Sequence, residues 1–136
     1  NEQRTLMTLW SIAQSPLMFG GDLPSCDDWT LSLLTNDEVL AVNQRGGNGR
    51  ELFRACDVRG VVWICDLPEP GEVALGLFNF SEVEENRITV PFSEAHLPEV
   101  CNVRDLWAGE ELGEHRAAFQ AEIAPHGAGL YRVRPA

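Results

Sequence analysis

Asp22 is the best-placed candidate for chemistry among the acidic residues of this sequence. It follows Gly20-Gly21, which end the short apolar run at residues 17–19. A carboxylate just after a buried strand could accept a hydrogen bond from a ligand hydroxyl or orient a neighbouring pocket residue. The alternative is structural, because aspartate readily forms an Asx turn or a helix cap. Asp22 is therefore a candidate substrate-binding residue, with capping as the favoured alternative on residue type alone.

The other acidic groups are expected to have structural roles. General acid–base work needs carboxylates that converge across a pocket, so the adjacent pair Asp27-Asp28 is expected to cap a helix. Asp105 precedes an apolar pair in a strand-like run and should make structural hydrogen bonds. The acids of residues 82–85 and Glu110-Glu111 are expected in solvated turns.

Histidines and cysteines show no metal-ligand spacing, so no metal and no cofactor are predicted. The cysteines form no CxxC pattern, and the histidines are dispersed; these residues are Cys26, Cys56, Cys65, Cys101, His96, His115 and His126. A turn near residues 58–60 would not place Cys56 and Cys65 opposite each other, so no disulfide is expected there. Cys65 lies in a strand-like apolar run and is expected to be a buried free thiol.

Tryptophan side chains could bind sugar faces, which makes a carbohydrate-binding role conceivable. Trp63 and Trp107 lie among apolar strand residues, where burial in the core is the commoner outcome. Trp29 follows an acidic pair and is the tryptophan most open to solvent by this argument.

Composition narrows the class of partner. The chain has 136 residues, 44% of them hydrophobic and 23% charged, and a formal net charge of −11 without any lysine. This acidic balance argues against nucleic acid and against an anionic membrane surface, whereas a neutral sugar is indifferent to it. The sequence shows no membrane-spanning apolar run and no secretory signal pattern, and it does not begin with Met. We expect it to be processed or cut from something longer, and its localisation stays open.

The first 45 residues have an α/β pattern. Leu6, Leu9, Trp10 and Ala13 recur at helical spacing and predict one apolar helix face, which ends before Pro16. A brief buried strand at residues 17–19 and helices opening at residues 27 and 36 should follow. One strand cannot close a parallel sheet, so this segment is predicted to be the end of a larger α/β domain that lies upstream.

After residue 45 the chain reads as an antiparallel β-sandwich or barrel. The glycine-rich stretch at residues 46–49 is the predicted linker and domain boundary. Strands are predicted at residues 51–56, 60–67, 72–80, 87–91, 102–107, 118–123 and 129–133. The strands at residues 61–64 and 73–80 are apolar on both faces and should be central strands of a sheet. Residues 87–90 alternate between apolar and polar side chains, so this strand should be more exposed on one side.

Four motifs resemble glycoside hydrolase family 27, the α-galactosidases and α-N-acetylgalactosaminidases. They are TLMTLWSIAQSPLMFGGDL at residues 5–23, LLTNDEVLAVNQ at 33–44, VRDLW at 103–107 and PHGAGLY at 125–131. The resemblance implies the last βα unit of a (β/α)8 barrel at residues 1–45 and a C-terminal β-sandwich at 46–136. It places Asp22 at the catalytic face, where the strands of such barrels end.

The resemblance also implies a retaining α-galactosidase with two catalytic aspartates. Retention needs carboxyls about 5–5.5 Å apart, and both family aspartates follow earlier strands. No position here matches either motif, so no catalytic residue is assigned and the isolated chain is expected to be inactive. The implied partners are an α-galactoside and an upstream catalytic domain that packs on residues 1–45. The alternative is a stand-alone, non-catalytic β-sandwich that binds a partner or a carbohydrate.

Overall fold

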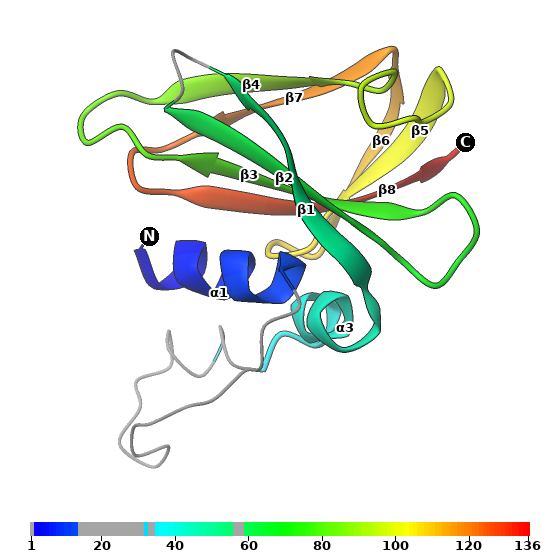
Figure 1. The fold of residues 1–136 in the computed structure, drawn as a ribbon, viewed down its shortest axis with the longest axis horizontal. Coiled ribbons are helices and arrows are strands. Elements are labelled where there is room, and N and C mark those ends of the chain that lie inside the picture. Colours follow the sequence, from blue (N-terminus) through cyan, green and yellow to red (C-terminus); the bar gives the residue numbers. More distant parts are fainter. Residues whose placement is uncertain (1, 14–31, 33–34, 56–58) are drawn as a thin grey trace.

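The computed structural model describes residues 2–13, 32, 35–55 and 59–136. Helix α1 spans Glu2–Ile12 and helix α3 spans Asp37–Arg45. The strands are β1 (Gly47–Ala55), β2 (Gly60–Asp66), β3 (Val73–Asn79), β4 (Asn86–Pro91), β5 (Val100–Asp105), β6 (Glu110–Arg116), β7 (Ala118–Ile123) and β8 (Ala128–Pro135) (Figure 1). The chain is therefore mostly β, as predicted. Neither of these helices is long and apolar enough to cross a membrane.

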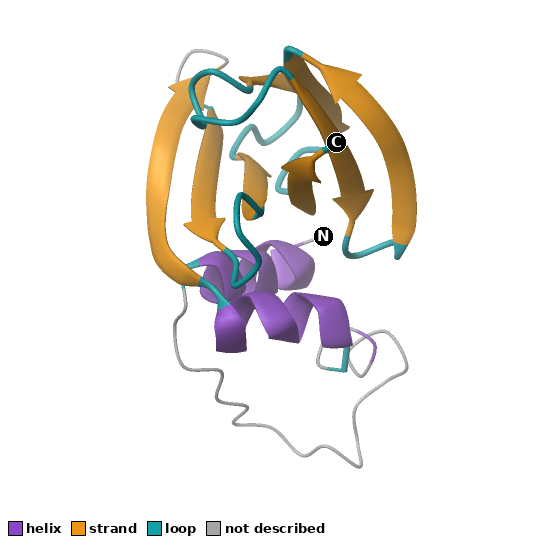
Figure 2. Ribbon diagram, turned by 90° about the vertical axis from the view of Figure 1, so that its right-hand side faces the viewer, coloured by secondary structure: helices purple, strands orange, loops and turns teal. Residues whose placement is uncertain are grey.

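The strands form two antiparallel sheets. A six-stranded sheet has the order β1-β2-β3-β8-β5-β6, and β4 pairs with β7 in a second sheet. Both helices lie on one side of the strands (Figure 2), and α1 contacts α3, β2, β3 and β8. The predicted antiparallel sandwich is confirmed, with helices covering one face of the larger sheet.

Two apolar cores lie on opposite faces of the six-stranded sheet. The core between the sheets includes Val62, Ile64, Leu75, Leu77, Ile88, Val90, Phe92, Val103, Phe119 and Val133. The core under the helices includes Ile12, Val39, Val42, Val61, Cys65, Ala74, Phe78, Leu106 and Leu130. Strands β2 and β3 contribute to both cores, which confirms that they are central. Strand β4 alternates between buried and exposed residues, also as predicted.

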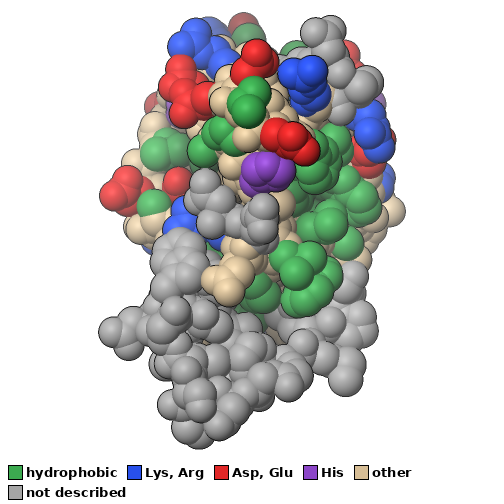
Figure 3. Space-filling view, turned by 90° about the vertical axis from the view of Figure 1, so that its left-hand side faces the viewer, with side chains coloured by type: hydrophobic (Ala, Val, Ile, Leu, Met, Phe, Trp, Pro, Cys, Tyr) green, Lys and Arg blue, Asp and Glu red, His purple; other side chains and the backbone are tan. Residues whose placement is uncertain are grey.

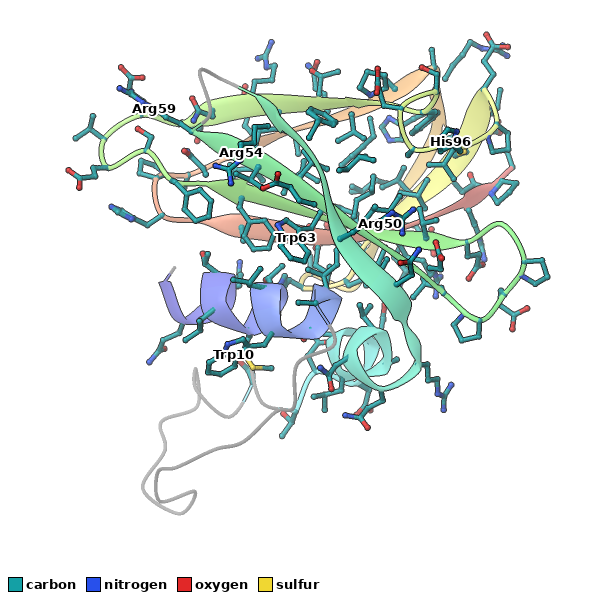
Figure 4. All side chains as sticks on the ribbon, viewed as in Figure 1. Trp10, Arg50, Arg54, Arg59, Trp63 and His96 are labelled. Carbon is teal, nitrogen blue, oxygen red and sulfur yellow. The ribbon has the colours of Figure 1, made fainter. Side chains whose placement is uncertain are left out.

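The side of α1 that packs on the sheet is not the same as the apolar face predicted from spacing. Met7, Thr8, Ser11 and Ile12 are the buried residues, whereas Leu6 is 45% exposed. Trp10 lies on the side of the helix away from the sheet (Figure 4). Thr8 can be buried because its hydroxyl donates to the Arg4 carbonyl oxygen at 2.7 Å and accepts from the Trp107 indole. Leu6 and Trp10 of the predicted apolar face therefore lie outside this contact.

The predicted solvated turn at Glu110-Glu111 is also wrong, because both residues begin strand β6. This strand pairs only with β5 and is almost wholly exposed. It forms an edge of the sheet, and charged residues at an edge discourage pairing with other chains. Such a strand lacks the alternation of apolar and polar residues by which strands were predicted. Strand β5 also ends at Asp105, two residues earlier than expected.

The predicted linker at residues 46–49 is mostly strand. Only Gly46 separates α3 from β1, and Gly47 already pairs with Asp66 of β2. The pairing is irregular between Gly47 and Arg50, and Asn48 has a φ of 55°. The register shift and the positive φ of Asn48 indicate a β-bulge or similar irregularity at the start of β1.

Helix α3 begins where the sequence indicated. Asn36 is its N-cap, and the Asn36 side-chain oxygen accepts hydrogen bonds from the backbone amides of Glu38 and Val39, each at 3.1 Å. Asp37 and Glu38 lie in the first turn, where negative charge is favourable to the helix dipole. The helix is thus fixed at its start by local sequence.

Candidate functional site

The predicted substrate-binding residue Asp22 lies outside the described residues, and so do Asp27, Asp28 and Trp29. The predicted barrel strand at residues 17–19 lies outside them as well. These expectations stay predictions.

The structure does not bring together, at one site, those candidate residues from the sequence that it describes. Asp105 makes the expected structural bond, since its Oδ1 accepts from the Ala108 amide at 3.0 Å. Residues 82–85 are exposed, as expected of a solvated turn. Trp63 and Trp107 are only half-buried, so their predicted core burial is met in part. Within the described ranges, no group of three His, Cys, Asp or Glu residues is placed to hold a metal ion.

Two cysteines with buried side chains lie in the described part of the chain. Cys65 is buried under the helices, as predicted, and Cys101 is buried between the sheets. Burial raises the pKa of the Cys101 thiol, so the protonated form is favoured. A protonated thiol is a poor nucleophile, so Cys101 is best explained as a small core residue.

The best-organised polar cluster joins α3 to the six-stranded sheet. Arg104 of β5 donates from Nε to Glu38 Oε2 at 2.8 Å and from Nη2 to Glu38 Oε1 at 2.7 Å. Its Nη1 also donates to Glu111 Oε1 at 3.3 Å. This two-point geometry fixes the orientation of both groups as well as their separation.

The hydrogen bonds from Arg104 hold the pKa of the Glu38 carboxyl below its usual range, against the opposing effect of partial burial. The same pairing raises the pKa of Arg104 above the ordinary arginine value. A general acid in a glycosidase needs the reverse, a carboxyl whose pKa is raised. Glu38 is therefore a structural anion.

A second set of contacts fixes α1 to the turn between β5 and β6. The Trp107 indole Nε1 donates to Thr8 Oγ1 at 2.8 Å, and the Arg4 guanidinium carbon lies 5.6 Å from the centre of the Trp107 ring. Thr5 Oγ1 donates to the His126 carbonyl oxygen at 2.6 Å. His126 has a φ of 57° and lies in the turn between β7 and β8.

Side-chain amides complete this junction between helices and sheet. Asn36 Nδ2 donates to the Leu106 carbonyl oxygen at 3.1 Å, and Asn43 Nδ2 donates to the Trp10 carbonyl oxygen at 3.2 Å. Sequence patterns did not identify Arg104, Thr8 or Asn43, because each acts through a partner far along the chain. The arrangement can hold two helices rigidly on a sheet.

Comparison with known proteins identifies this architecture. Residues 60–133 match the family described as alpha galactosidase C-terminal beta sandwich domain. An alpha-galactosidase from Coffea arabica is 33% identical over 98% of this chain and 35% of its own length.

Two solved structures share the fold. One is a glycoside hydrolase family 27 β-L-arabinopyranosidase from Geobacillus stearothermophilus, with a TM-score of 0.92 and 44% identity over 99% of this chain and 30% of that one. The other is a putative alpha-N-acetylgalactosaminidase from Bacillus halodurans, with a TM-score of 0.90 and 33% identity over 99% of this chain and 31% of that one.

The chain therefore spans about a third of the length of each of these proteins. The relatives are alpha-galactosidases and related family 27 enzymes, and they match the helices as well as the sandwich. The chain belongs to the alpha-galactosidase C-terminal β-sandwich family and corresponds to the C-terminal portion of a glycoside hydrolase family 27 protein.

Proposed function

We propose that this chain is the C-terminal part of a retaining α-galactosidase that hydrolyses terminal α-D-galactosides. The catalytic aspartates lie on an upstream barrel, and the sandwich supports the barrel by holding its last helices. Asp22 is proposed to contact the substrate at the catalytic face. The chain by itself is inactive.

The two-sided character of α1 is the observation that carries this proposal. Its inner side, with Ile12, packs on the sheet, and Trp107 binds its Thr8 hydroxyl. Its outer side carries Leu6, which is 45% exposed, and Trp10. A barrel helix also needs an apolar side toward the barrel strands, so this outer side is where we place the upstream domain.

The substrate proposal extends to close analogues of α-D-galactose. The β-L-arabinopyranose ring has the stereochemistry of α-D-galactopyranose without the exocyclic hydroxymethyl group, and one neighbour in structure acts on it by name. The direct test is to express the full reading frame and this chain separately. Each is assayed with aryl α-D-galactoside, aryl β-L-arabinopyranoside and aryl α-N-acetylgalactosaminide.

We expect turnover of the galactoside by the longer protein, with the α-anomer as first product by NMR, and none by this chain alone. Turnover by the pure chain, sensitive to a galactose-like inhibitor, would show that the catalytic acids are within residues 1–136. An inverted first product would exclude the retaining mechanism.

A second candidate is a non-catalytic module that acts alone. The apolar core between its two sheets favours it, because a sandwich with its own core can fold as a unit. The side of the molecule shown in Figure 3 gathers hydrophobic side chains beside scattered charged ones, and Phe80 is 53% exposed. A reading frame that begins at this chain would favour the module over the enzyme.

A further inference from the structure

A hollow of about 200 Å³ lies where the first turn of α1 meets the end of β5 and the turn between β7 and β8. Its polar and aromatic lining comes from Arg4, Asp105, Trp107, Glu122 and Tyr131. These residues come from three distant parts of the sequence. Neither the sequence motifs nor the fold requires so many hydrogen-bonding groups around one small space.

Tyr131 is the most informative of the lining residues. It is only 7% exposed. Its ring packs against Phe119, with the ring centroids 4.7 Å apart. Burial and the nearby Asp105 charge raise the pKa of Tyr131 to about 12, so the hydroxyl remains a neutral donor at physiological pH.

Arg4 and Trp107 form one wall of the hollow. The guanidinium lies over the indole ring, whose Nε1 is fixed by its bond to Thr8 Oγ1. The indole therefore has a set orientation, and it offers an apolar surface beside a group rich in hydrogen-bond donors. A planar apolar surface next to donors suits a pyranose ring, which has C–H faces and a rim of hydroxyls.

The acceptors are the carboxylates Asp105 and Glu122. Asp105 Oδ1 accepts from the Ala108 amide at 3.0 Å, and Glu122 Oε1 accepts from the Arg87 guanidinium at 2.7 Å. A carboxylate can accept about four hydrogen bonds, so both retain capacity. Arg4 balances Asp105 in charge, and Arg87 balances Glu122, so the hollow favours neither an anion nor a cation.

We propose that this hollow binds one pyranose ring of a neutral saccharide, with the Tyr131 hydroxyl and Arg4 as donors, Asp105 and Glu122 as acceptors and Trp107 as the apolar wall. It binds sugar without turning it over.

The placement of the hollow gives this binding a use, and this step alone rests on the proposed function. Helices of a (β/α)8 barrel start at the end where the strands finish, which is the end that bears the active site. Arg4 lies in the N-terminal half of the described part of α1, so the hollow lies toward that end of the barrel. It is placed to hold a distal sugar of a branched or extended galactoside.

The test is an NMR or calorimetric titration of the 136-residue chain with D-galactose, L-arabinose and methyl α-D-galactopyranoside. We expect saturable binding in the millimolar range, with the largest shift at the Trp107 indole. Arg4→Met should weaken it roughly tenfold, the loss of a hydrogen bond to a charged group. The matched control Arg134→Met, at an exposed position near the chain end, should leave affinity unchanged.

A second pair guards against a variant that fails to fold. Glu122→Gln changes a side chain that is 52% exposed, and Glu114→Gln on exposed β6 is its control. The site is supported if Glu122→Gln weakens binding and Glu114→Gln does not. Absence of saturable binding in the wild-type chain overturns it, and so does binding that neither Arg4→Met nor Glu122→Gln weakens. If the full-length protein hydrolyses galactosides while the chain binds none, only the hollow is disproved. If the chain binds sugar but the full-length protein does not hydrolyse galactosides, only the proposed enzymatic function is disproved.

Discussion

Arg104 donates two hydrogen bonds to the carboxylate of Glu38, across 66 positions of sequence, at 2.8 and 2.7 Å. The pair lies at the edge of the core formed by the helices and the sheet. Glu111 of β6 accepts a further bond from Arg104, and Arg132 of β8 lies 3.9 Å from Glu111. Helix α3 is thus joined by charge to three neighbouring strands of the sheet.

This pairing predicts a specific response to acid. Pairing lowers the folded-state pKa of Glu38 below its ordinary value of about 4.3, so its stabilisation is present above that value and is lost as pH falls through the folded pKa. Glu38→Gln should lower the urea midpoint at pH 7, and the difference from wild type should shrink toward pH 3. The measurement is urea unfolding followed by tryptophan fluorescence across this range.

The control for Glu38 is Glu114→Gln on the exposed edge strand, which should change the midpoint little at any pH. A gap between Glu38→Gln and wild type that stays constant from pH 7 to pH 3 would contradict a pKa lowered by Arg104.

The bond between Trp107 and Thr8 predicts a measurable coupling between the α1 helix and the sandwich. Trp107→Phe removes the Nε1 donor and should cost about 1–3 kcal/mol in unfolding free energy, because Thr8 is fully buried. Thr8→Val removes the acceptor and should cost a similar amount. The double variant should lose about 1 kcal/mol less unfolding free energy than the sum of the losses in the two single variants. Strict additivity in denaturant unfolding would show that the hydrogen bond contributes nothing.

Much of the fold could be predicted because its signals are local. Strand β3 is buried at every position and reads as an unbroken apolar run, while β4 shows simple alternation. Asn36 and the acids after it predict the start of α3, and the structure confirms it. In each case a short window of sequence holds both the cause and the result.

The parts that could not be predicted depend on distant partners. Strand β6 has one large hydrophobic residue, Leu112, and is a strand because β5 pairs with it. Thr8 is buried because the Trp107 indole, 99 positions away, satisfies its hydroxyl. Of the candidate site, the sequence offered Asp22, which lies outside the described residues, and it offered no sign of the hollow around Tyr131.

Asn36 combines two roles that substitution can separate. Its oxygen caps α3, while its Nδ2 donates to the Leu106 carbonyl on the turn after β5. Asn36→Ser should keep the cap and lose the Leu106 bond, at about 1 kcal/mol. Asn36→Ala should lose both the cap and the Leu106 bond, which should cost about a further 1 kcal/mol of unfolding free energy. Equal stabilities for the two variants in thermal or urea unfolding would mean that the side-chain oxygen does not cap the helix.

Tyr131 gives the sharpest test of the structure, because it is the chain's single tyrosine. Phenolate absorbance therefore reports this one residue. In the folded chain it should titrate at about 12, whereas the unfolded chain in urea should titrate near 10.

The same shift sets the alkaline stability of the chain. The pKa of Tyr131 is higher in the folded chain than in the unfolded chain, and this difference adds to the free energy of unfolding. The contribution is fully present below about pH 10 and is lost as pH rises through about 12. It amounts to about 2–3 kcal/mol for a shift of this size. Tyr131→Phe lacks the ionisable group, so its unfolding free energy should fall less steeply than that of wild type between pH 10 and 12. Parallel curves for the two proteins, or a folded phenolate that forms near pH 10, would mean that the Tyr131 hydroxyl is open to bulk water and does not line an enclosed hollow.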